Sequence, residues 1–189
     1  MARDMIRLAI EAVLNGDIAL ARSVIASDDD VDALEKETMR TVVMSVGLEA
    51  PVAGDLMMLV GTMGVIGEIE KVADDAVKLA RRATKLAGYF PSEMKLALNQ
   101  MGEAANRMFM SAIKLYVDYS HDLADQIVLA DEGVDKQYVE ARARVFELIR
   151  KDPGETEHLV RTIEAFHALE HVADHAVEIA RRLRLQYGE

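Results

Sequence analysis

The sequence contains no cysteine and no tryptophan, and it is poor in proline, glycine and aromatic residues. Without cysteine, the chain forms neither disulfides nor thiolate metal sites. Three prolines and eleven glycines among 189 residues leave few interruptions for helices. Aromatic residues make up only 5%, whereas strands favour aromatic and β-branched side chains. Because Ala, Leu, Val and Met dominate the apolar residues, the composition predicts an all-α fold.

Long hydrophobic runs and an excess of positive charge are absent as well. No apolar run reaches the ~18–20 residues that a membrane-spanning helix needs. The formal charge of −11 disfavours binding to the phosphate backbone of nucleic acid or to anionic lipid surfaces. The first residues mix both charges too closely for a signal peptide. We therefore expect a cytoplasmic protein that neither spans a membrane nor binds nucleic acid.

The chain contains an internal repeat. Residues 70–82 and 170–182 are identical at nine of thirteen positions, at a spacing of 100 residues, and the acidic segments 28–32 and 131–135 correspond at a spacing of 103. Turn residues divide each copy into three helical segments, of which the second and third run roughly 30 residues. We predict a tandem repeat of two three-helix bundles of long antiparallel helices, residues 1–88 and 89–189. The first segment of the first copy is much shorter than its counterpart, which predicts incomplete helical cover at one end of that bundle.

Each copy carries two pairs of acids at i and i+4, so that both side chains of a pair lie on one helix face. The first copy has Asp28 and Asp32 on its second segment and Glu70 and Asp74 on its third. The equivalent acids of the second copy are Asp131, Asp135, Glu170 and Asp174. Projected at about 100° per residue, all four pairs fall on the apolar stripes that should face the bundle cores. Val43 and Val46 share the stripe of Asp32, and Phe146 shares that of Asp135.

Buried carboxylates without partners cost several kcal/mol each, so we expect each set of four acids to hold metal. Oxygen ligands favour iron(III), manganese, magnesium or calcium, with zinc as an alternative. The competing interpretation is that these acids are solvated or form salt bridges between helices. The motif Glu164-x-x-His167 lacks the second such motif that a di-iron bundle requires. His171 and His175 project away from the apolar stripe and are predicted to be exposed.

Several motifs resemble those of the PhoU family. Residues 50–56 (APVAGDL) resemble its Pro-Val-Ala-x-Asp-Leu signature, and residues 70–74 and 170–176 resemble its repeated Glu-Arg-Ile-Gly-Asp-His-Ala motif. Residues 28–32 and 131–135 match its Asp-x-x-x-Asp motif. The resemblance covers essentially the whole chain. It departs from the family at Asp75, where the family tends to have His or Asn, and in the short first segment.

The resemblance implies a PhoU-like pair of three-helix bundles, usually dimeric. In some members the acidic motifs bind multinuclear iron clusters; zinc, manganese or magnesium are the alternatives for this chain. It further implies a regulator without enzymatic activity, which couples the ATPase subunit of the phosphate-specific ABC transporter to a sensor histidine kinase and represses phosphate-starvation signalling. Two other interpretations stay open: a PhoU-like module of a potassium or sodium–phosphate transporter, and a carboxylate-bridged di-metal enzyme.

Overall fold

The computed structural model describes residues 1–49, 51–86 and 88–188, and these are helical apart from short connections. The helices are α1 (Ala2–Asn15), α2 (Ile18–Ala26), α3 (Asp28–Glu49), α4 (Ala53–Leu86), α5 (Lys95–Val117), α6 (His121–Lys151) and α7 (Thr156–Gln186). Two 3₁₀ turns, η1 (Ser92–Met94) and η2 (Pro153–Glu155), precede α5 and α7. No helix in the described part of the chain is long and apolar enough to cross a membrane. The predicted all-α class is confirmed.

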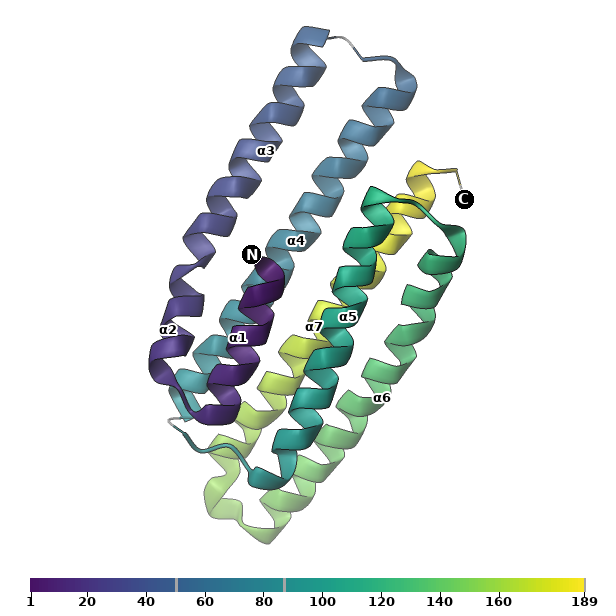
Figure 1. Ribbon diagram of the computed structural model, residues 1–189. Coiled ribbons are helices and arrows are strands. Elements are labelled where there is room, and N and C mark those ends of the chain that lie inside the picture. The colour runs from purple at the N-terminus through teal and green to yellow at the C-terminus, as the bar shows by residue number, and fades with distance from the viewer. Residues whose placement is uncertain (50, 87, 189) are drawn as a thin grey trace.

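The helices form two three-helix bundles that lie side by side (Figure 1). In the first bundle α1 and α4 pack with a leg made of α2 and α3, and in the second α5, α6 and α7 pack together. The bundles join through α4 and α7, which run antiparallel, and one hydrophobic core extends through both. The tandem arrangement is therefore confirmed. The predicted boundary between residues 88 and 89 falls between α4 and α5, and as a domain boundary it stays a prediction.

The second leg of the first bundle is interrupted at Ser27, where the sequence predicts one continuous helix. The Ser27 hydroxyl donates to the Ser23 carbonyl at 3.0 Å, and α3 begins at the next residue. Three aspartates, Asp28 to Asp30, then occupy the first turn of α3. Negative side chains are favoured there because the helix dipole is positive at its N-terminus. The equivalent helix α6 runs unbroken over 31 residues. Ala50, the predicted end of this leg, lies outside the described residues.

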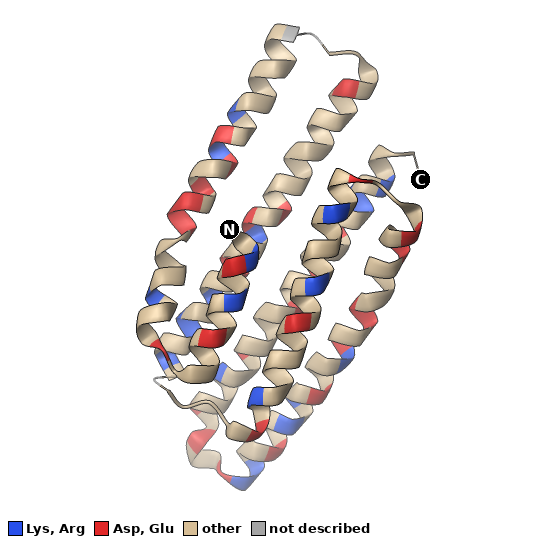
Figure 2. Ribbon diagram, in the orientation of Figure 1, with Lys and Arg blue, Asp and Glu red and all other residues tan. Residues whose placement is uncertain are grey.

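The short α1 leaves one end of the α3–α4 hairpin without a third helix, as predicted (Figure 1). α1 has 14 residues, whereas its counterpart α5 has 23. Between residues 41 and 67 only Glu49 and Asp55 are charged, so that end of the hairpin shows little colour in Figure 2. We call its exposed apolar side chains the apolar overhang. Its members are Val43, Met44, Val46, Leu48, Val52, Leu56, Met57, Met58 and Val60.

Candidate metal centres

The eight predicted acids lie on the flanks of their helices and not in the bundle cores. Asp135 and Asp174 are exposed, and the other six are half-buried. On the second legs the buried face is offset by one residue from the predicted one: Val42 and Val145 are buried, whereas Val43 and Phe146 are 59% and 49% exposed. The predicted core placement of the acids is therefore wrong.

The error on α7 has a physical cause. α7 packs against α4, α5 and α6, so that apolar residues surround most of its circumference. A projection centred on Glu170 then finds apolar neighbours even though Glu170 lies on the remaining polar stripe.

In the second bundle the four acids nevertheless converge between α6 and α7. Burial, together with the charges of Asp135 and Asp174, raises the pKa of Asp131 to about 6. Burial and the nearby Asp174 raise the pKa of Glu170 as well. The Oδ1 atom of Asp131 is shielded from solvent and accepts no hydrogen bond from the residues that the structure describes. This set is therefore a concentrated negative site with an unpartnered acceptor.

The first bundle repeats this arrangement between α3 and α4. Burial and the charges of Asp74 and Asp32 raise the pKa of Asp28. Burial and Asp74 likewise raise the pKa of Glu70. Asp32 has a local partner, because Lys36 Nζ lies 3.0 Å from its Oδ2. That contact lies within α3, so it is not the salt bridge between helices of the competing interpretation, and it engages one acid of the four.

The donor chemistry of both sets fits a hard, multiply charged cation. A cation would relieve the mutual repulsion of the acids and link the second leg of each bundle to its third helix. Within the described residues, no three acids of either set bring their oxygens within 4.8 Å of one another. A single ion would need these side chains to rotate inward, whereas a cluster of several ions would span them more easily. The donor set therefore fits a hard cation, and the number of ions in each set stays a prediction.

A buried polar cluster that the sequence did not predict lies between the two repeats. Glu68 and Asp75 of α4 are 2% and 1% exposed. On the facing helix, His175 Nδ1 lies 2.8 Å from Glu68 Oε2, and His175 Nε2 lies 3.3 Å from Asp75 Oδ2. Arg182 and Lys71 also pair with Glu68, at 3.2 Å and 2.9 Å. The contacts of His175 and Arg182 join α4 to α7 by charge as well as by apolar packing, whereas Lys71 lies on α4 itself.

Opposite charges stabilise the ionised forms in this cluster. Burial alone would raise the pKa of Asp75, but His175 and Lys78 hold it below its ordinary value. Burial alone would also lower the pKa of His175, but Asp75 and Glu68 raise it above 6.5. His175 is only 21% exposed, so the prediction of an exposed histidine is wrong for this residue. The available signal was the repeat itself, since positions 75 and 175 are equivalent and carry an acid and a base.

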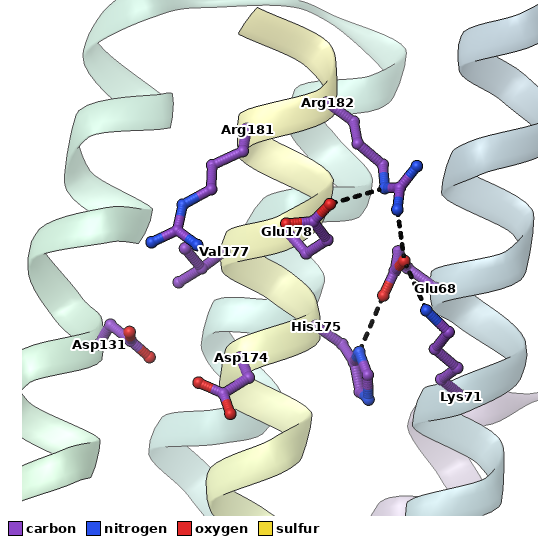
Figure 3. Close-up of a pocket in the computed structure, with 9 residues that line it drawn as sticks. All are labelled: Glu68, Lys71, Asp131, Asp174, His175, Val177, Glu178, Arg181 and Arg182. Carbon is purple, nitrogen blue, oxygen red and sulfur yellow. Dashed lines mark hydrogen bonds and ion pairs between the residues drawn. The ribbon is translucent and has the colours of Figure 1, made fainter.

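A groove beside α7 connects the buried cluster to the acids of the second bundle (Figure 3). It is lined on one side by Glu68 and His175 and on the other by Asp131 and Asp174. Arg181 and Arg182 lie at one end of it, where Arg182 bridges Glu68 and Glu178. Two of the four predicted metal ligands of the second bundle, Asp131 and Asp174, thus line this groove.

Comparisons with known proteins agree on one family. A family model described as the PhoU domain matches residues 1–83 and 98–183. A phosphate-specific transport system accessory protein PhoU homolog of Aquifex aeolicus is 28% identical over 153 residues, which are 81% of this chain and 69% of that protein. The homolog of the same name from Pseudomonas aeruginosa is 27% identical over 174 residues, 91% of this chain and 72% of that protein.

Solved structures show the same architecture. The crystal structure of PhoU from Pseudomonas aeruginosa superposes with a TM-score of 0.92 at 25% identity, over 98% of this chain and 90% of that one. The phosphate transport system regulatory protein PhoU from Streptococcus pneumoniae gives 0.88 at 19% identity, over 99% and 88%, and so shares the fold. With the PhoU domain matched in each repeat and the fold shared along the chain, this protein belongs to the PhoU family.

Proposed function

We propose that this protein is an accessory regulator of phosphate-specific transport. The observation that carries the proposal is the match of sequence, along most of the chain, to proteins named as accessory proteins of phosphate-specific transport systems, together with the fold shared with PhoU. In this proposal it acts in the cytoplasm as a negative regulator, between the ATPase subunit of the ABC transporter and a sensor histidine kinase. Regulation without catalysis is supported by the same names.

Co-purification tests the proposed partners. When phosphate is abundant, the tagged protein should retain the ATPase subunit and the histidine kinase of the phosphate system, and deletion of its gene should derepress a phosphate-starvation reporter. Co-purification with a potassium or sodium–phosphate transporter in place of these two, with an unchanged reporter, would contradict the proposal and support the alternative module. An unrelated helical bundle with a similar negative charge is the control for non-specific retention.

We also propose that the two acidic sets bind metal, with multinuclear iron as the first candidate and zinc, manganese or magnesium as the alternatives. The proposal is supported by the duplicated convergence of four carboxylates and by the unpartnered Oδ1 of Asp131. Asp28, Asp32, Glu70 and Asp74 would hold the metal of the first bundle. Asp131, Asp135, Glu170 and Asp174 would hold that of the second. The metal would neutralise the acids and fasten one helix to another.

Finally, we propose that the protein forms a homodimer through the apolar overhang. Its surface is continuous with an apolar groove lined by Leu56, Met57, Val60 and, from α7, Leu185. Contiguous exposed apolar patches on soluble proteins mark interaction sites, and a second copy of the same hairpin is an equally apolar partner.

The dimer proposal predicts an effect of charge in the overhang. Met57→Lys combined with Val60→Lys should convert a dimer into a monomer in size-exclusion chromatography with light scattering, because burying two like charges costs several kcal/mol. Leu129→Lys is the matched control, since Leu129 is an exposed apolar residue of α6, 66% exposed and outside the overhang. A monomeric wild type, or a double variant that stays dimeric, would refute this interface.

A further inference from the structure

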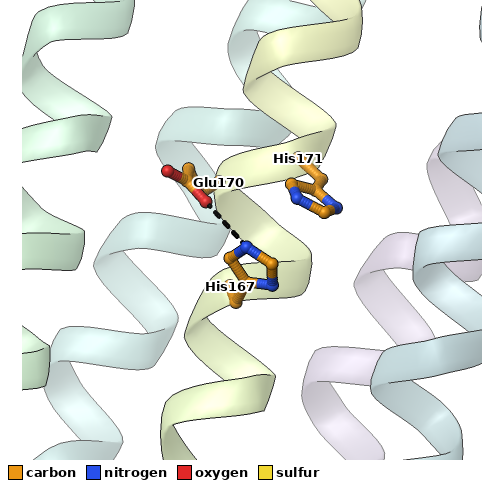
Figure 4. Close-up of side chains that lie close together, drawn as sticks. All are labelled: His167, Glu170 and His171. Atoms are coloured by element: carbon orange, nitrogen blue, oxygen red, sulfur yellow. Dashed lines mark ion pairs between the residues drawn. The ribbon is translucent and has the colours of Figure 1, made fainter.

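Two histidines and a glutamate gather on the polar stripe of α7 (Figure 4). His167, Glu170 and His171 are spaced i, i+3 and i+4, which brings their side chains to one face within a single turn. Each contributes a donor atom, and the three donors lie within 4.8 Å of one another. The imidazole centroids are 4.1 Å apart, and His167 Nε2 lies 3.5 Å from Glu170 Oε2. Within the described residues, no other three histidine, aspartate or glutamate donors approach so closely.

The chemistry of this trio differs from that of the acidic sets. Two imidazole nitrogens and one carboxylate oxygen suit a divalent transition metal of intermediate softness, such as zinc, cobalt or nickel, whereas oxygen-only sets suit harder ions. Two histidines one helical turn apart can chelate a single ion. His167 and His171 are 49% and 38% exposed, so water can complete the coordination shell.

A buried carboxylate of α4 lies beside the trio. Asp75, which is 1% exposed, faces the trio from α4, with Oδ1 3.7 Å from His171 Nδ1. Its Oδ2 is shielded from solvent and lies 3.3 Å from His175 Nε2. The opposing cations are His175 and Lys78, whose Nζ lies 2.8 Å from Asp75 Oδ1. From α6, the ring of Tyr138 packs 5.7 Å from that of His167. A carboxylate close to one ring nitrogen of a histidine helps to orient the ring, so that the other nitrogen can bind a metal.

The first repeat cannot form an equivalent trio. At the spacing of 100 residues, His167 and His171 correspond to Gly67 and Lys71, which offer no imidazole. Lys71 instead pairs with Glu68 at 2.9 Å. We propose that His167, Glu170 and His171 form a nitrogen-rich site for one divalent transition metal ion, present in the second repeat alone. The site shares Glu170 with the acidic set proposed for the second bundle, but its two imidazole ligands lie outside that set, and the inference does not depend on the proposed phosphate regulation.

Zinc titration of the full chain tests the site. After chelator treatment and its removal, one equivalent of Zn²⁺ should shift the ring nitrogens of His167 and His171 in ¹H–¹⁵N correlation spectra, and those of His158 should stay in place. Co²⁺ should give a visible spectrum typical of nitrogen ligation. Because outer-shell partners alone are worth roughly 10- to 100-fold in metal affinity, His167→Gln with His171→Gln should weaken Zn²⁺ binding by at least about 100-fold. Both positions are solvent-exposed enough for the double variant to fold.

Two controls separate this site from other effects. His158→Gln removes a histidine of the same helix that also pairs with a glutamate, Glu155 at 2.9 Å, and it should leave Zn²⁺ affinity unchanged. Asp131→Asn with Asp135→Asn weakens the acidic set and spares the trio, so the histidine shifts should persist. If the two asparagines abolish Zn²⁺ binding while the two glutamines do not, or if the imidazoles do not respond, the proposed site is wrong. Neither result would bear on the proposed phosphate regulation.

Discussion

A variant with both Asp75→Val and His175→Leu is expected to be more stable than one with His175→Leu alone. Loss of His175 leaves Asp75 buried with one cation fewer and should cost about 3 kcal/mol of unfolding free energy, because a buried charge has lost its partner. Removing Asp75 as well eliminates that stranded charge, while Glu68 keeps Lys71 and Arg182. Urea unfolding in the presence of a chelator should give a coupling energy of about 1.5 kcal/mol or more.

The same double-mutant cycle has a predictable dependence on pH. The pKa of His175 is raised above 6.5, so its charge contributes fully below that pH and the contribution is lost as pH rises through the folded-state pKa. The pKa of Asp75 is lowered, so its contribution is present above its unfolded pKa and is lost as pH falls. The coupling should therefore peak between about pH 4.5 and 6.5 and decline toward alkaline pH.

An exposed ion pair provides the control for this cycle. Arg7 and Glu11 of α1 lie 3.5 Å apart with side chains 59% and 49% exposed. Their replacement by alanine, singly and together, should give a coupling below about 0.5 kcal/mol at any pH. If the Asp75–His175 cycle is additive like this one, the buried contacts do not hold the repeats together as inferred.

Replacing Glu70 and Glu170 by glutamine is expected to remove most of the metal that the acidic sets bind. Metal analysis of protein purified without chelator should show about half of the wild-type content after either single replacement and near-background content after both. Neutralising one acid lowers the total negative charge with which the set attracts the cation. Unchanged occupancy would exclude these two residues as ligands.

Stability measurements distinguish a lost ligand from a damaged fold. Metal bound only by the folded state stabilises it by about 2.7 kcal/mol at 100 times the dissociation constant. The double glutamine variant should lose this stabilisation by bound metal. In chelator it should be at least as stable as the wild type, because the pKa values of Glu70 and Glu170 are raised and their charges therefore oppose folding. A variant that is already destabilised in chelator would argue against a role specific to metal.

The sequence predicted the elements of this fold better than the faces of its helices. The repeat and the long apolar segments predict two helical bundles, since both can be read directly from the sequence. Val43 and Phe146 were assigned to buried faces because an apolar residue at the edge of a stripe resembles one at its centre, and a rotation of one residue is about 100°. The eight acids were recognised from spacing and repetition. Although the buried faces of the second legs are offset from the predicted ones, the two acid pairs of each set still lie next to each other.

The inter-repeat cluster could not be predicted in the same way. Glu68 is buried only because α7 covers α4, and His175 becomes its partner through a contact between residues 107 positions apart. No local pattern encodes such a pairing. The trio on α7 was visible as a spacing in the sequence, but its significance depends on the stripe that stays open when three other helices cover the rest of α7.

The contact between Asp75 and His175 also bears on how the duplicated chain could have arisen. A residue that touches its own equivalent lies close to the pseudo-twofold axis between the repeats. In a symmetric pair of separate, identical units, that position would confront an identical side chain, and two buried acids or two buried bases would repel each other. Fusion into one chain frees the two positions to diverge. A chain that contains both repeats can therefore place an acid opposite a base on this axis. A symmetric homodimer of single repeats cannot, because both of its units carry the same residue there.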